Sequence, residues 1–229
     1  MIKYLVKLVS NEKYADDLLQ GSLFMNAAGY FHYLEKGQGD ECEAGISSEV
    51  KIYKGSRFPI YCMYIIEEGD IFNKNTLIIN QECINKLQCQ NGWAVVIPYH
   101  KFEYLLETCQ LETNGYALYW GKVDYRRKTF SDTKRYLSGN GIDNVFIKNP
   151  NYSYQKEFRI VLPQNCKIEP FKEYIDGDYV EVLSEKSYKP VICRFKNELC
   201  HIAEKYSLNG IKMDGKYAYL QISNKLVAL

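Results

Sequence analysis

The sequence predicts an α+β fold in which mixed or antiparallel β-sheets form a central cleft with flanking helices. Apolar runs of strand length outnumber the helical segments, and the two kinds do not alternate regularly as a doubly wound parallel sheet requires. The chain has 229 residues, of which 46% are hydrophobic. This is enough to bury a sizeable core, and we expect one globular domain over residues 1–229.

The first segments predicted are a strand, a helix and a second strand close together in the chain. Alternating β-branched and aromatic residues predict a strand over 3–9. Ser-Asn-Glu then begins a helix over 12–20 that ends at Gly21. A short strand over 23–25 and one or two helical turns over 27–34 follow.

The centre of the chain predicts mostly strands. Helical spacing of apolar residues appears after Pro98, and Gly121 is a candidate β-bulge. We expect strands at 49–53, 59–66, 93–97 and 116–123, a turn at 67–70, and helices at 81–87 and 99–109.

The last third begins with a segment, 124–153, that has no clean period and is typical of a functional loop. A hairpin over 209–223 is predicted to turn at Asp214-Gly215. Between them we expect strands at 157–162, 179–183 and 191–195 and a helix at 197–206.

Charge and cysteine usage limit the class of protein. The 29 basic and 28 acidic residues leave a net charge of +1, which excludes a globally basic nucleic-acid-binding protein but allows a local patch. The eight cysteines form no C-x-x-C pair, and no apolar run has the length of a signal peptide or membrane span. We therefore expect a cytoplasmic protein with free thiols and no membrane partner.

The most informative local pattern is Gln155-Lys156-Glu157 at the start of an apolar strand. If both Gln155 and Glu157 lie on the strand, their side chains face the same way and converge on a cleft. Such a carboxylate can stabilise a positively charged sugar at a transition state. The alternative is a solvated strand end at which Glu157 pairs with a nearby Lys or Arg.

This Q-x-E, together with the strand, helix, glycine and strand over residues 3–26, resembles the ADP-ribosyltransferases, including bacterial and phage relatives related to toxins and defence. The resemblance implies that NAD binds in a cleft between β-sheets and that a macromolecule, protein or nucleic acid, is modified. It implies a catalytic role for Glu157 and an acceptor-orienting role for Gln155. The family's first-strand Arg or His and its Ser-Thr-Ser motif are absent here. The cofactor contacts implied are Lys7, Asn26, Tyr30 and Phe31.

A second hypothesis is that the chain is a non-enzymatic phage or mobile-element protein. It would be a binding protein or inhibitor that engages nucleic acid or a nucleoprotein complex. Three of the six arginines lie in the basic and aromatic segment 119–136. Arg and Lys contact phosphates and exposed aromatic rings stack on bases. A solvated face or contact with a protein partner are the alternatives. The candidate contacts are Arg126, Arg127, Lys128 and Arg135.

Other groupings are weaker. The acidic, glycine-rich loop 35–45 has carboxylates suited to Mg²⁺ or Ca²⁺ but not the spacing of an EF-hand, so a solvated loop is the simpler interpretation. Cys193, Cys200 and His201 lack the paired spacing of a zinc site. We therefore expect NAD as the cofactor and no metal.

Overall fold

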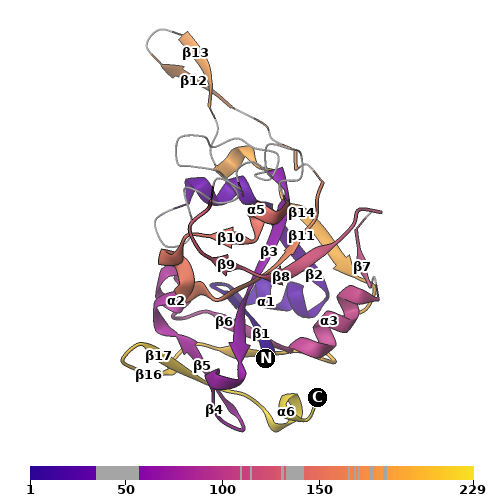
Figure 1. Cartoon of the computed structure of the whole chain (residues 1–229), viewed down its shortest axis with the longest axis vertical. Coiled ribbons are helices and arrows are strands. Elements are labelled where there is room, and N and C mark those ends of the chain that lie inside the picture. The colour runs from indigo at the N-terminus through magenta and orange to yellow at the C-terminus, as the bar shows by residue number, and fades with distance from the viewer. Residues whose placement is uncertain are drawn as a thin grey trace.

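The computed structural model describes residues 1–34, 57–108, 110–113, 115–129, 132, 142–164, 166–167, 169, 171–175, 178–182 and 185–229. The fold consists of helices and mainly antiparallel sheets, with one short parallel pair, so the predicted α+β class is confirmed (Figure 1). None of the helices in these ranges is both long and apolar enough to span a bilayer.

The main sheet has nine strands and divides into two arms. Its order is β15-β6-β1-β3-β2-β14-β7, and β11 and β8 extend it from the other edge of β3. Its strands are β1 (Ile2–Val9), β2 (Ser22–Ala27), β3 (Pro59–Glu67), β6 (Trp93–Pro98), β7 (Leu111–Glu112), β8 (Tyr119–Lys122), β11 (Glu157–Val161), β14 (Val191–Phe195) and β15 (Glu204–Ser207).

The division arises because β1 and β2 pair with the same edge of β3 at different positions along the strand. The register of β1 on β3 runs from Glu67 to Tyr64, whereas β2 pairs only at Ile60 and Pro59. Since β11 pairs with β3 from Ile60 to Tyr64, it occupies the opposite edge. Neither β1 nor β2 pairs with β3 between these two regions. The sheet therefore forks around Cys62.

Helices α1 (Glu12–Leu19) and α3 (Tyr99–Glu107) cover one face of the fork. The Asn11 side chain caps α1 by accepting a hydrogen bond from the Lys13 amide at 2.9 Å, and Gly21 ends the helix region with a φ of 88°. Because α1 packs on β1 and β6 of one arm and on β2 of the other, it holds the two arms together.

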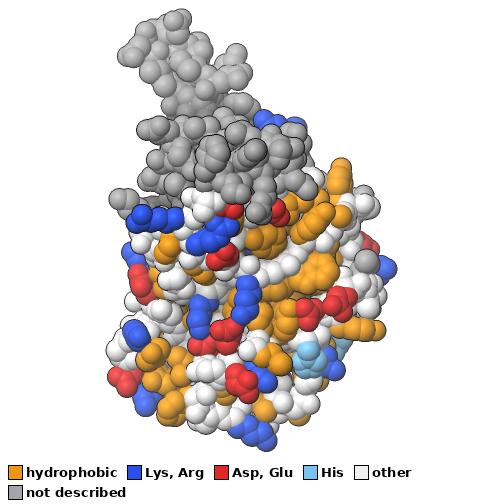
Figure 2. Space-filling model, viewed as in Figure 1, with side chains coloured by type: hydrophobic (Ala, Val, Ile, Leu, Met, Phe, Trp, Pro, Cys, Tyr) orange, Lys and Arg blue, Asp and Glu red, His pale blue; other side chains and the backbone are white. Residues whose placement is uncertain are grey.

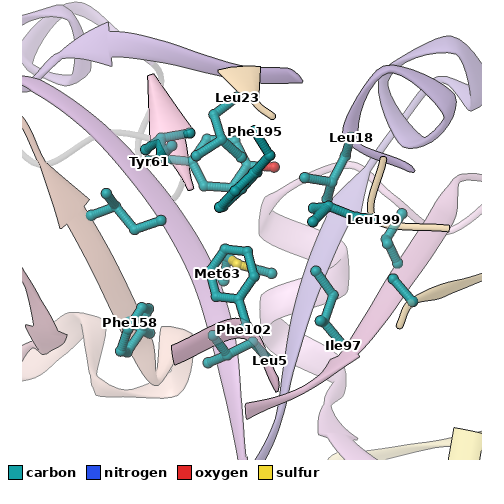
Figure 3. Close-up of a cluster of buried hydrophobic side chains, with 14 of the residues drawn as sticks. Leu5, Leu18, Leu23, Tyr61, Met63, Ile97, Phe102, Phe158, Phe195 and Leu199 are labelled. Atoms are coloured by element: carbon teal, nitrogen blue, oxygen red, sulfur yellow. The ribbon is translucent and has the colours of Figure 1, made fainter. Parts of the chain in front are cut away.

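The principal core lies between these helices and the fork (Figure 3). Alternate residues of β3, including Tyr61 and Met63, face this core, while Tyr64 and Ile66 face a second one. The labelled members of the principal core come from both arms and from both helices: Leu5, Leu18, Leu23, Ile97, Phe102, Phe158, Phe195 and Leu199.

The second core lies between the main sheet and a smaller four-stranded sheet of order β16-β17-β5-β4. Helix α2 packs on β5, and Gly215, at a φ of 57°, forms the turn between β16 and β17. The elements are β4 (Ile71–Asn73), β5 (Thr76–Asn80), α2 (Gln81–Lys86), β16 (Lys212–Asp214), β17 (Tyr217–Gln221) and α6 (Asn224–Ala228).

Short elements complete the described part of the chain. A hairpin of β12 and β13 stands out from the rest of the molecule in Figure 1. On the face shown in Figure 2, hydrophobic side chains gather over the region of β8, with acidic and basic side chains interspersed. The remaining elements are η1 (Ala28–Tyr33), η3 (Glu68–Asp70), β9 (Asp124–Tyr125), α5 (Ile142–Val145), β10 (Ile147–Lys148), η4 (Pro150–Gln155), β12 (Phe171–Ile175), β13 (Asp178–Val182) and η5 (Glu185–Ser187).

Most predicted elements agree with this structure, but several predictions need comment. The stretch 124–153, expected as a loop, contains β9, α5, β10 and η4 among its described residues. The helix expected over 197–206 is wrong: turns lead into strand β15, which pairs with β6. The register of β8 on β11 is continuous through Gly121, so the expected bulge is absent. The strand at 49–53 and the acidic loop 35–45 lie outside the described residues.

Candidate functional site

A pocket of about 660 Å³ occupies the fork of the main sheet. Its walls come from β1, β2 and β3, from β10, β11 and β14, and from one side of α1. This volume lies within the range of about 300–1,000 Å³ that is usual for small-molecule and cofactor sites. The pocket therefore follows from the divergence of β1 and β2.

All six residues that the sequence predicts for catalysis or cofactor contact line this pocket. Lys7 comes from β1 and Asn26 from β2, while the other four come from η1 and from the junction of η4 with β11. These segments lie up to about 150 residues apart in the chain. The six are Lys7, Asn26, Tyr30, Phe31, Gln155 and Glu157.

Gln155 and Glu157 reach the pocket by a different route from the one predicted. Gln155 is the last residue of a 3-10 helix, not part of a strand, and Glu157 begins β11. Lys156 between them has a φ of 40°, in the left-handed region that non-glycine residues seldom adopt. Its ammonium group binds both carboxylate oxygens of Asp70 at 2.7 Å. This contact supports the turn that brings both neighbours to the pocket.

Glu157 is the centre of a buried ion triad. Its Oε1 accepts a hydrogen bond from Lys148 Nζ and its Oε2 accepts one from Arg159 Nε, both at 2.7 Å. The three side chains are at most 8% exposed, and all three line the pocket. The expected alternative of an ion pair at this strand end is thus present, but in a buried site and not in a solvated one.

The neighbouring cations Arg159 and Lys148 keep the Glu157 carboxylate ionised. Burial by itself raises the pKa of the carboxyl group, but the positive charges of Arg159 and Lys148 outweigh it, and the pKa lies well below the ordinary range. The backbone N–H of Glu157 also donates to the Tyr125 hydroxyl at 2.8 Å. Glu157 is therefore an ionised carboxylate in a defined position.

Lys7 lies where the two arms separate. Its ammonium group donates to the backbone carbonyl of Cys62 at 2.8 Å and lies 4.3 Å from the centre of the Tyr61 ring. Burial lowers the pKa of Lys7. Burial also raises the pKa of the Cys62 thiol to about 12, so this pocket cysteine is protonated at neutral pH.

Aromatic rings and a basic excess complete the lining. Tyr30 and Phe31 meet edge to face, with ring centres 5.4 Å apart. The pocket is lined by five basic side chains and two acidic ones, although the whole chain has a charge of only +1. The five are Lys7, Lys13, Lys148, Arg159 and Arg194.

Four of these basic residues, all except Lys7, are not candidates from the sequence. Arg159 could have been found, because it stands two residues after Glu157 on the same strand and so faces the same side. Lys148 and Arg194 come from strands whose pairing the local sequence does not reveal.

The described part of the basic segment 119–136 lies outside the pocket, and Arg126 forms ion pairs within it. Arg126 binds the two carboxylate oxygens of Asp132 at 2.6 and 2.9 Å and Asp124 at 2.6 Å. Arg127 is exposed and Lys128 half-buried, and none of the three lines the pocket. Arg135 lies outside the described residues.

Within the described ranges no group of three or more His, Cys, Asp or Glu side chains is arranged to hold a metal ion. Comparison of the chain with protein-family models, curated proteins and solved structures finds no match in any of the three. The case for a function therefore rests on the geometry of the pocket.

Proposed function

We propose that the chain is an ADP-ribosyltransferase-like enzyme that binds NAD in the forked-sheet pocket and modifies a macromolecular target. The observation that carries this proposal is the convergence on one pocket of six residues selected from the sequence for this chemistry. The basic excess of the lining suits a diphosphate, and the aromatic residues suit flat rings.

In the proposed reaction, NAD supplies an ADP-ribosyl group whose bond to nicotinamide breaks, with the electron pair leaving on nicotinamide. In this step one oxygen of the ionised Glu157 carboxylate turns from Lys148 or Arg159 toward the ribose and stabilises the positive charge that develops there. Gln155 orients the nucleophile of the acceptor, which then bonds to the ribose carbon and loses a proton. Tyr30 and Phe31 hold the nicotinamide ring.

Binding is tested first, by isothermal titration of NAD into the purified protein and its Tyr30→Ala variant. Because stacking on one ring is worth about 1–3 kcal/mol, we expect the variant to bind at least about fivefold more weakly. Tyr104→Ala is the matched control, since Tyr104 is exposed on α3 and does not line the pocket. The proposal fails if NAD does not bind, or if both variants bind it as well as the wild type.

Chemistry is tested by nicotinamide release. Glu157→Gln should lower turnover by about 100-fold or more, the usual cost of removing a preorganised electrostatic group. Because this variant also loses the charge that balances Lys148 and Arg159, the assay is run below its measured unfolding temperature. Unchanged turnover in a folded Glu157→Gln protein would refute the mechanism.

A further inference from the structure

The open end of the pocket carries apolar side chains that are exposed to solvent. Tyr14 is 57% exposed, Phe24 52% and Ile192 56%, and all three line the pocket. Together with Lys13 and Arg194, they are called the rim. Large exposed apolar side chains that line one opening are typical of an interaction surface or a ligand-binding groove.

Strand pairing places the rim on one continuous surface. Phe24 and Ile192 are direct cross-strand partners in the pair of β2 and β14, and Arg194 lies opposite Ser22 two residues further along. Alternate residues of a strand share a face, so Phe24, Ile192 and Arg194 stand side by side. Tyr14 and Lys13 come from α1, which packs on β2 and contributes to the same pocket lining.

The two cations of the rim are available for a ligand. Lys13 and Arg194 are exposed, and neither forms an ion pair with any of the described residues. Acidic residues near them are Glu12, Asp16 and Asp17 on α1 and Glu112, which lies opposite Arg194 on β7. Glu12 and Asp16 are both bound by Lys205. In contrast, Arg126 of the predicted basic segment is engaged by two carboxylates.

We propose that the rim binds single-stranded nucleic acid and that the acceptor of the proposed reaction is one of its nucleotides. Exposed aromatic rings stack on bases that are not paired in a duplex, while Lys and Arg contact the phosphates between them. A strand held by Phe24, Tyr14 and Arg194 lies at the opening of the pocket that contains Glu157. The acceptor role rests on the proposed function, whereas binding of the strand does not.

The experiment is fluorescence anisotropy with a labelled oligothymidine of about 12 nucleotides, within the usual site size for such surfaces, measured without NAD. Oligouridine of the same length distinguishes DNA from RNA, and a duplex of the same length tests the preference for single strands. We expect the single strand to bind with an affinity that falls steeply with salt. Phe24→Ala should weaken binding by about 5-fold to 150-fold.

Charge and matched controls make the test specific. Arg194→Glu should weaken binding and also reduce its dependence on salt. Phe72→Ala and Lys212→Glu are the controls, because both residues are exposed but belong to the four-stranded sheet. The controls should bind as the wild type does.

The proposal is overturned if neither single strand binds at low salt, if the duplex binds as tightly, or if Phe24→Ala and Arg194→Glu bind as the controls do. If rim variants lose the strand while NAD turnover is absent even in the wild type, the proposed function fails and the rim site stands. If NAD is turned over but the strand does not bind, the rim proposal alone fails.

Discussion

Replacing Glu157 by Gln removes the negative charge between two buried cations and changes the shape of the side chain very little. Lys148 is 5% exposed and Arg159 is completely buried, so water offsets little of either charge in this structure. In the variant an uncharged amide stands in place of the carboxylate between these two basic side chains. The triad should therefore make this conservative substitution strongly destabilising.

The size of the effect follows from burial. Removing one partner of a buried ion pair costs about 3–5 kcal/mol of the free energy of unfolding. For a chain of this length each kcal/mol corresponds to about 2–4 °C, so we expect the melting temperature to fall by about 6–20 °C.

The effect also depends on pH. Since the folded pKa of Glu157 is depressed, its stabilisation is complete above the unfolded value of about 4.3. It is lost as the pH falls through the folded pKa. The difference between wild type and variant should be constant from pH 6 to 8 and shrink in acid.

Urea unfolding followed by tryptophan fluorescence measures this loss, because Trp120 lies opposite Ile160 on β11. Glu68→Gln is the control: Glu68 is 73% exposed, its nitrogen–oxygen distance to Lys3 is 3.8 Å, and such a pair contributes about 0–1 kcal/mol. If Glu157→Gln costs no more than Glu68→Gln at pH 7, the triad does not stabilise the fold and the reasoning is refuted.

Three further outcomes can be checked on the same protein. Gly92→Ala should lower the melting temperature markedly, because an added Cβ lies 2.2 Å from a backbone carbonyl oxygen of β1. Gly69→Ala is the control and should not lower it, because the space around Gly69 is open. Equal melting temperatures of the two variants would contradict this. Iodoacetamide at pH 7.5, mapped by mass spectrometry, should modify exposed Cys200 well before Cys62, whose pKa is raised to about 12 by burial, and the reverse order would be evidence against that burial. Asn11→Ala should cost about 1 kcal/mol in urea unfolding through loss of the α1 cap, and no loss would mean that the cap is not stabilising.

Local patterns were sufficient for most elements of the fold. The strand at 3–9, the capped helix that follows and the strand at 157–162 depend on side-chain period, a capping residue and a glycine at positive φ. The error at 197–206 has a physical cause, because β15 is a strand through its pairing with β6 and not through its own sequence. Pairing with a distant partner decided this element.

The candidate site also depends on contacts between residues that are far apart in the chain. The sequence identifies the residues at its centre, Gln155 and Glu157, but it predicts their common direction from a strand that does not include Gln155. The left-handed turn at Lys156 produces that direction, and it depends on Asp70, which lies 86 residues away. A sequence pattern contains no information on such a contact.

The sequence alone therefore predicted the α+β class, the order of most helices and strands, and a set of polar and aromatic residues suited to one chemistry. The tertiary structure decided that β1 and β2 separate on the edge of β3, that a pocket opens at Cys62, and that Lys148 and Arg159 hold Glu157 as a buried carboxylate. The reason is physical. Periodicity and capping act over a few residues, whereas strand register and the balance of buried charge depend on groups that only folding brings together.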